Sequence, residues 1–226
     1  MPKKKTVKTL SYMAAWGFWS SILRPYFRPL VLGSHRIPRT GGLLVAANHF
    51  SFVDPLLLGI LLPRRIRFVM SADIFRVPVV HAFSRAMDVI PVEKGSKAMI
   101  TTVKRSLSHL EKGSAVGIFP EGQRSRSGTL LPPRRGLGVL AARSEAPVVP
   151  VAIVGTREAF PPGAFMPRPH RVAVSVGEPL RYDGSVNEKE IPGMAMDAIA
   201  DMIHRMGRAD YLMDSVYDPS AGRTVP

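Results

Sequence analysis

The stretch LLVAANHFSFVDPLLLGILL, residues 43–62, decides the fold of this 226-residue chain, because it joins a strand to a helix through a polar turn. Leu43 to Ala47 is a short apolar run, typical of a buried strand. Asp54 and Pro55 are typical of the N-cap and N1 positions of a helix, and the apolar run that follows predicts that helix. The stretch therefore predicts one strand–turn–helix unit of an α/β sheet.

Apolar runs and helical spacings alternate along the rest of the chain. They predict strands at 66–70, 89–92, 115–119, 148–154 and 171–176, and helices at 97–111, 134–146 and 191–206. Strands that alternate with helices predict a single layered α/β domain with a largely parallel central sheet flanked by helices. With 46% hydrophobic residues, a chain of this length can bury one sizeable core. A proline-rich loop is predicted at 160–169.

His49 and Asp54 lie on the predicted turn and at the predicted helix start. On one continuous helix, residues five apart diverge by roughly 140°, so the two side chains can meet only across the turn. An imidazole oriented by a carboxylate is a suitable general base. The alternative is that Asp54 only caps the helix and that His49 only satisfies a loop carbonyl.

A polar turn, FPEGQRSRSG at 119–128, follows the predicted strand 115–119. Its backbone N–H groups and guanidinium groups suit an anionic oxygen cluster such as a phosphate. The turn lacks the Gly-Lys-Ser/Thr ending of a nucleotide P-loop, which argues against nucleotide hydrolysis. The alternative is a solvated basic loop in which Gly122 and Gly128 serve turn geometry.

Four stretches, in order, resemble the signature blocks of the PlsC-like glycerolipid acyltransferases, the 1-acyl-sn-glycerol-3-phosphate acyltransferase family. Asn48-His49-x-Ser51-x-x-Asp54 is similar to the first block and FPEGQRS at 119–125 to the third. VIPVEK at 89–94 resembles the second block, and VVPVAI at 148–153 the fourth. The chain departs from the family at Lys94, where an arginine is usual, and at Gln123, where a threonine is usual; both concern acceptor recognition more than chemistry.

The resemblance implies an O-acyltransferase that moves a fatty acyl chain from acyl-CoA or acyl carrier protein to the sn-2 hydroxyl of lysophosphatidic acid, giving phosphatidic acid. His49, held by Asp54, is expected to take the proton from the acceptor hydroxyl as its oxygen attacks the thioester carbonyl. No serine nucleophile is required, so Ser51 is expected to be structural. Backbone N–H groups beside Gly122 are expected to stabilise the tetrahedral intermediate.

The same resemblance implies an acceptor site on the second and third blocks. Glu121, Gly122 and Arg124 are expected to build it, with Arg124 and Lys94 facing the phosphate. No cofactor is expected beyond the acyl donor, and no metal site is expected because the remaining histidines lack ligand spacing.

Two other functions stay open. One is an acyltransferase of the same family whose acceptor is another lysophospholipid, an aminolipid or a glycolipid. An alternative from a different functional class is a catalytically silent membrane-binding protein of the same fold. The presence of both His49 and Asp54 argues against the silent protein, since a scaffold has no need of a base and its orienting carboxylate.

The charge balance favours an anionic partner, because 31 basic residues against 17 acidic ones give a formal charge of +14. Basic residues flank an apolar run at 10–23 that contains Tyr12, Trp16, Phe18 and Trp19. This pattern predicts an amphipathic helix in the headgroup layer of an anionic membrane, and the run falls short of the about 20 apolar residues needed to span one. The alternative is ordinary docking of this helix onto the core. Nucleic acid is not an expected partner, since no binding motif is present.

The predicted organisation is a membrane-associating segment at 1–36, an acyltransferase domain at 37–210 and an irregular tail at 211–226. The absence of cysteine excludes disulfides and thiolate chemistry. No clear cleavable signal peptide is present, so the predicted location is the cytoplasmic face of the cell membrane, as a peripheral or monotopic protein.

Overall fold

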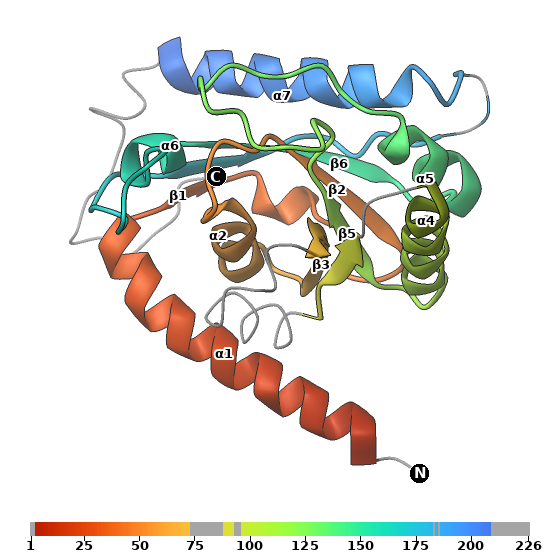
Figure 1. The fold of residues 1–226 in the computed structure, drawn as a ribbon, viewed down its shortest axis with the longest axis horizontal. Helices are drawn as coiled ribbons and strands as arrows, with labels where there is room; N and C mark the ends of the chain where they lie inside the picture. Colours follow the sequence, from red (N-terminus) through yellow and green to blue (C-terminus); the bar gives the residue numbers. More distant parts are fainter. Residues whose placement is uncertain (1–2, 73–87, 93–95, 183, 185, 209–226) are drawn as a thin grey trace.

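The computed structural model describes residues 3–72, 88–92, 96–182, 184 and 186–208, so the predicted tail and Lys94 lie outside the described residues. Figure 1 shows the elements, which are, in chain order, α1 (Lys3–Phe27), β1 (Leu30–Leu32), the 3-10 turn η1 (Ser34–Arg36), β2 (Leu43–Ala47), α2 (Asp54–Leu61), β3 (Ile66–Ser71), β4 (Ile90–Val92), α4 (Ser96–Glu111), β5 (Ala115–Ile118), α5 (Gly136–Ser144), β6 (Val148–Val154), α6 (Thr156–Ala159), β7 (Ala173–Val176) and α7 (Ile191–Arg208).

These strands form one sheet in the order β1-β7-β6-β2-β5-β3-β4. Every neighbouring pair is parallel except β6 with β7, which is antiparallel. The predicted α/β domain with a largely parallel sheet is confirmed. Parallel strands are covered on both faces, and all five residues of β2 are accordingly buried.

Helices cover both faces of the sheet (Figure 1). On one face, Val45 of β2 joins a core with α2 and the C-terminal end of α1. On the other, Leu44 joins a core with residues of α4, α5 and α7. Alternate residues of the same strand thus serve opposite layers, as the two-residue period of a strand requires.

The sheet begins before residue 37, which differs from the predicted domain boundary. β1 lies within the segment assigned to the membrane, yet it pairs in parallel with β7 from Leu30 to Leu32. A three-residue strand between Pro29 and Gly33 is too short to show a periodicity, and its partner β7 lies far along the chain.

Helix α1 is longer than the predicted run at 10–23, and its two sides have different surroundings. Leu23 and Phe27 are buried in the core, and Trp19 packs against it. Other large apolar side chains of the helix are exposed, namely Met13, Trp16, Phe18 and Ile22. The helix therefore docks on the protein through its C-terminal part and still presents an apolar outer side. Among the described residues, no helix combines the length and the apolar character needed to cross a membrane.

Candidate active site

The carboxyl ends of β2 and β5 lie side by side, because the two strands are parallel neighbours in the sheet. The connection after β2 covers one face through α2, whereas the connection after β5 covers the other face through α5. Connections that leave neighbouring strands toward opposite faces open a crevice at the strand ends. His49 follows β2, and the 119–128 turn follows β5, so both predicted motifs lie at these strand ends.

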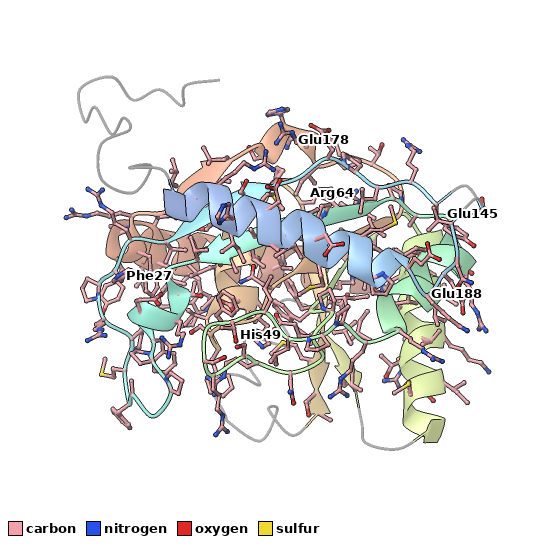
Figure 2. All side chains as sticks on the ribbon, turned by 90° about the horizontal axis from the view of Figure 1, so that it is seen from above. Phe27, His49, Arg64, Glu145, Glu178 and Glu188 are labelled. Atoms are coloured by element: carbon pink, nitrogen blue, oxygen red, sulfur yellow. The ribbon has the colours of Figure 1, made fainter. Side chains whose placement is uncertain are left out.

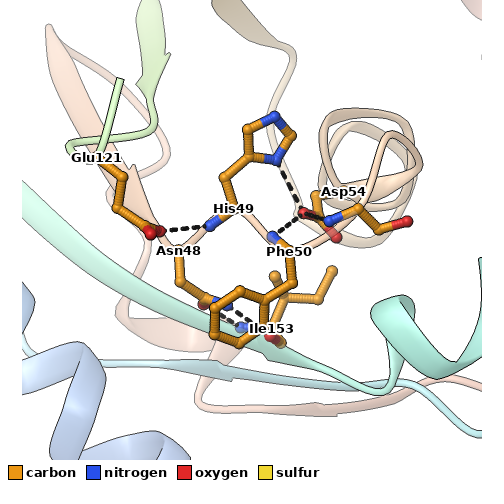
Figure 3. A network of polar contacts seen from close by, with 7 residues as sticks. Asn48, His49, Phe50, Asp54, Glu121 and Ile153 are labelled. Carbon is orange, nitrogen blue, oxygen red and sulfur yellow. Dashed lines mark hydrogen bonds and ion pairs between the residues drawn. The ribbon is translucent and has the colours of Figure 1, made fainter. Parts of the chain in front are cut away.

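His49 and Asp54 meet across the turn between β2 and α2 (Figure 3). Oδ2 of Asp54 lies 2.9 Å from Nδ1 of His49 and accepts the backbone N–H groups of Phe50 at 2.8 Å and Ser51 at 2.7 Å. Asp54 is fully buried. The predicted capping role is wrong: Val53 is the N-cap, Asp54 is the first helical residue, and no side chain caps the helix. The carboxylate instead turns back to the histidine.

This geometry assigns the proton of the imidazole. Oδ2 of Asp54 accepts two backbone N–H groups, so it is also the acceptor in its contact with His49. Nδ1 of His49 is therefore the donor in that contact. In the neutral ring, Nε2 then carries the lone pair. Figure 3 shows Nε2 pointing away from Asp54, and no described residue forms a hydrogen bond with it. The arrangement can accept a proton at Nε2 and stabilise the resulting imidazolium.

Aromatic rings hold the imidazole from the side. The ring of Phe119 stacks on His49 with centroids 4.0 Å apart and an interplanar angle of 18°. Phe68 of β3 stacks on Phe119 in turn, at 5.4 Å. Because both phenylalanines are buried, the imidazole has a rigid apolar wall on this side, and its rotation is restricted.

The 119–128 turn also holds the backbone of His49. Oε1 of Glu121 accepts the N–H of His49 at 2.8 Å, and the N–H of Ser125 donates to the carbonyl of His49 at 2.8 Å. The other oxygen, Oε2, accepts the N–H of Leu131 at 2.9 Å. Burial raises the pKa of Glu121, and these two backbone donors oppose that shift. Glu121 was predicted to help build the acceptor site; in the structure its two oxygens each accept a backbone N–H, and one of these contacts positions His49.

Gly122 and Arg124 complete the described part of the predicted acceptor site. Gly122 has a φ of 67°, and a Cβ there would lie 2.5 Å from Cδ of Arg134, so the turn needs glycine. Its N–H donates to the carbonyl of Phe119 at 3.0 Å and is thus used within the turn. The guanidinium of Arg124 lies 3.7 Å from the centroid of the half-exposed Phe52 ring. Burial lowers the pKa of Arg124, yet a guanidinium stays charged at neutral pH.

Two neighbours of the site escaped prediction. Phe52 supports Arg124 through a ring contact that depends on the folded positions of two loops. Asn48 is fully buried, and its amide donates to the carbonyl of Ile153 and accepts the N–H of Ile153, both at 2.8 Å. The side chain thereby extends the pairing of β2 with β6 beyond Ala47. In the sequence, only the position of Asn48, between the predicted strand and His49, indicates that its amide could extend the sheet.

Residues 28–154 match the model of the family described as Acyltransferase. The chain belongs to the acyltransferase family. It is 32% identical over 149 residues to a chloroplastic 1-acyl-sn-glycerol-3-phosphate acyltransferase of Brassica napus, covering 65% of this chain and 43% of that one. It is 28% identical over 154 residues to the 1-acyl-sn-glycerol-3-phosphate acyltransferase of Bacillus subtilis, covering 66% of this chain and 72% of that one. This acyltransferase-family chain thus spans less than half the length of the plant relative.

A solved structure supports the fold of this acyltransferase-family chain. The crystal structure of the 1-acyl-sn-glycerophosphate acyltransferase PlsC from Thermotoga maritima superposes with a TM-score of 0.78 at 24% sequence identity. The match covers 92% of this chain and 85% of that one. Within the part of the chain that the structure describes, no group of three or more His, Asp or Glu side chains could hold a metal ion.

Replacing Asn48 with alanine is expected to lower the free energy of unfolding by roughly 2–5 kcal/mol, because it leaves both the N–H and the carbonyl of Ile153 buried without partners. Chemical denaturation followed by circular dichroism measures this change. Asn48→Asp is the matched variant: it keeps an acceptor for the N–H but sets a carboxylate against the carbonyl, so it should be at least as unstable. A loss below about 1 kcal/mol in Asn48→Ala would contradict the extension of the sheet by this amide.

Proposed function

We propose that this chain is an O-acyltransferase that transfers a fatty acyl chain from an acyl thioester to the sn-2 hydroxyl of lysophosphatidic acid. The observation that carries the proposal is the His49–Asp54 pair, whose Nε2 is left open beside a basic turn. The relatives named above are 1-acyl-sn-glycerol-3-phosphate acyltransferases, which supports this acceptor. The product is phosphatidic acid.

In the proposed mechanism, Nε2 of His49 takes the proton of the acceptor hydroxyl while its oxygen attacks the thioester carbonyl. The negative charge of Asp54 stabilises the imidazolium that forms. The tetrahedral intermediate then breaks its C–S bond, and the leaving thiolate takes the proton from the imidazolium. Transfer is direct, without an acyl-enzyme. Ser51, whose side chain is fully buried, supports this assignment because a buried hydroxyl cannot meet the donor.

Arg124 is proposed to bind the acceptor phosphate. Its guanidinium lies on Phe52, three residues after His49 in the sequence, so a phosphate held there keeps its glycerol moiety close to the base. Guanidinium groups bind phosphate through paired hydrogen bonds. Lys94 is proposed as a second phosphate contact. The donor is acyl-CoA or acyl carrier protein, since both are acidic and suit a chain with a formal charge of +14.

The enzyme is proposed to work at the surface of an anionic membrane, on its cytoplasmic face, as a peripheral or monotopic protein. Support comes from the outer side of α1, where Met13, Phe18 and Ile22 are exposed. The helix also carries lysines in its N-terminal turns and Arg24 near its C-terminal end. Apolar and aromatic side chains together with cations are what a helix in the headgroup layer needs.

Arg124→Ala is expected to raise KM for lysophosphatidic acid about 10- to 100-fold, because it removes a charge-assisted hydrogen bond that contributes about 1.5–3 kcal/mol. Steady-state assays with one radiolabelled acyl donor and a panel of lysolipids measure the effect. Arg126→Ala, two positions along the same turn and exposed, is the matched control and should keep a KM close to the wild-type value. Transfer by the wild type only to acceptors without phosphate would contradict the role of Arg124.

A further inference from the structure

The loop from Phe160 to Arg171, between α6 and β7, presents two large apolar side chains at its tip. Phe165 is 97% exposed and Met166 is 68% exposed. The loop contains no acidic residue, and Arg168, His170 and Arg171 follow the tip. An exposed apolar tip with cations behind it is the distribution of side chains that a bilayer surface stabilises, since the tip enters the acyl region and the cations meet the headgroups.

The exposure of this tip is built into the fold. The N–H of Arg168 donates to the carbonyl of Ala159 at 2.7 Å and closes the base of the loop. The N–H of Ala164 donates to the carbonyl of Pro161 at 3.1 Å, which forms a turn before the tip. Tyr26 of α1 donates its hydroxyl proton to the carbonyl of Pro167 at 2.7 Å, just after the tip. These contacts fix the loop against α1, so the two apolar side chains are held outward.

A basic cavity of about 490 Å³ lies where this loop meets the C-terminal end of α1. Arg28, His170 and Arg171 line it, together with Tyr26 and proline rings, and no acidic side chain is in the lining. Three basic side chains around one cavity suit a phosphate group. The lining shares no residue with the candidate active site. In Figure 2, Phe27, which also lines the cavity, lies at the left of the molecule, well apart from His49.

We propose that Phe165 and Met166 enter the bilayer beside α1, and that the cavity at Arg28, His170 and Arg171 binds the phosphate of a membrane phospholipid. The tip and the cavity belong to one loop, and the cavity adjoins the end of α1, whose outer side carries the exposed Phe18 and Ile22. The apolar and the basic residues therefore belong to the same loop and to the helix that it contacts. This second lipid contact rests on the proposed function only in placing the enzyme at a membrane.

The test measures the binding of the full chain to vesicles of phosphatidylcholine alone and of phosphatidylcholine mixed with anionic phosphatidylglycerol. Phe165→Ser/Met166→Ser should lower the partition coefficient about tenfold or more on both, because two apolar side chains no longer leave water. Arg28→Asn/Arg171→Gln should lower it about fivefold per cation on the mixed vesicles and less on the neutral ones. Asparagine is chosen because it tolerates the φ of 40° at residue 28.

Matched controls come from α7 and the segment before it. Met194 of α7 is 43% exposed, and Lys189 follows Glu188, which Figure 2 labels at the edge of the molecule opposite Phe27. Met194→Ser and Lys189→Gln should bind both kinds of vesicle like the wild type. Equal losses in these controls, or wild-type binding by the tip variant, would overturn the proposal.

Other occupants give distinct results. If inorganic phosphate raises the Tm of the wild type but not of the cavity variant, and that variant binds vesicles normally, the cavity binds free phosphate and the lipid assignment falls. If the tip mediates self-association, the tip variant changes the sedimentation of the free protein and leaves vesicle binding intact, which also overturns the proposal.

Transfer to a short-chain, monomeric lysophosphatidic acid without vesicles separates the membrane contact from the proposed acyl transfer. In this assay the tip variant should transfer the acyl chain at the wild-type rate. If the wild type itself shows no transfer, that result counts against the proposed function and not against the membrane contact.

Discussion

His49→Ala is expected to lower kcat for acyl transfer to lysophosphatidic acid by about 10²- to 10⁴-fold, because it removes the group proposed to take the hydroxyl proton. The fold should persist. The side chain is 16% exposed, and the main losses are its contact with Asp54 and its stacking on Phe119, of which the stacking is worth about 0.5–1.5 kcal/mol. A radiometric assay in detergent–lipid micelles measures the rate, and vesicle binding reports that the membrane surface is intact.

Ser51→Ala is the control for this experiment. Among the described residues, Oγ of Ser51 is buried without a hydrogen-bond partner, while the backbone N–H of Ser51 that holds Asp54 survives the change. The variant should therefore turn over close to the wild-type rate. Wild-type activity in His49→Ala together with an inactive Ser51→Ala would replace the general base with a serine nucleophile.

Asp54→Asn is expected to lower kcat by about 10²- to 10⁴-fold while the backbone of the turn stays in place. The reason is that His49 and the two backbone N–H groups converge on one oxygen, Oδ2. An asparagine can offer one oxygen to the same three donors, so this variant removes the charge proposed to stabilise the imidazolium and keeps the acceptor. Rapid-quench measurement of a single turnover isolates the chemical step from product release.

Asp54→Ala separates the charge from the structure. It leaves the N–H groups of Phe50 and Ser51 buried without their acceptor, at roughly 1–3 kcal/mol each, and should therefore lower Tm as well as kcat. If Asp54→Asn is as unstable as Asp54→Ala, the asparagine oxygen does not replace Oδ2 as the acceptor. The activity that Asp54→Asn loses then no longer reports on the charge alone. If Asp54→Asn is stable and fully active, Asp54 does not assist the base.

The sequence predicted the central strands and the edge strand β4 well, and it missed the other edge strand, β1. The bounds predicted for Leu43–Ala47 and Val148–Val154 coincide with β2 and β6, because strands buried on both faces are continuous apolar runs. The partner of β1 is β7, far along the chain, whereas β4 pairs with the nearby β3. β7 runs antiparallel to β6, and the apolar run predicted at 171–176 carries no sign of its direction.

At the site, the local contact was predictable and the long-range ones were not. His49 and Asp54 are five residues apart, so turn geometry alone indicated that they could meet. The carboxylate of Glu121 holds a backbone N–H 72 residues away, and the amide of Asn48 pairs with a strand residue 105 away. Such partners follow from the order of the strands in the sheet. The roles assigned to these residues in transfer stay predictions until the variants are assayed.

The double attachment of the His49 backbone to the 119–128 turn has a consequence for how acceptors are discriminated. Glu121 and Ser125 grip the two peptide groups of His49, and Arg124 lies between them in the sequence. If Arg124 binds the acceptor phosphate as proposed, an anion seated there is expected to influence the alignment of Nε2 as well, because both belong to the same turn contacts. Part of the binding energy of the phosphate would then go into aligning the base. An alcohol without a phosphate should accordingly lose turnover at saturation, beyond its weaker affinity.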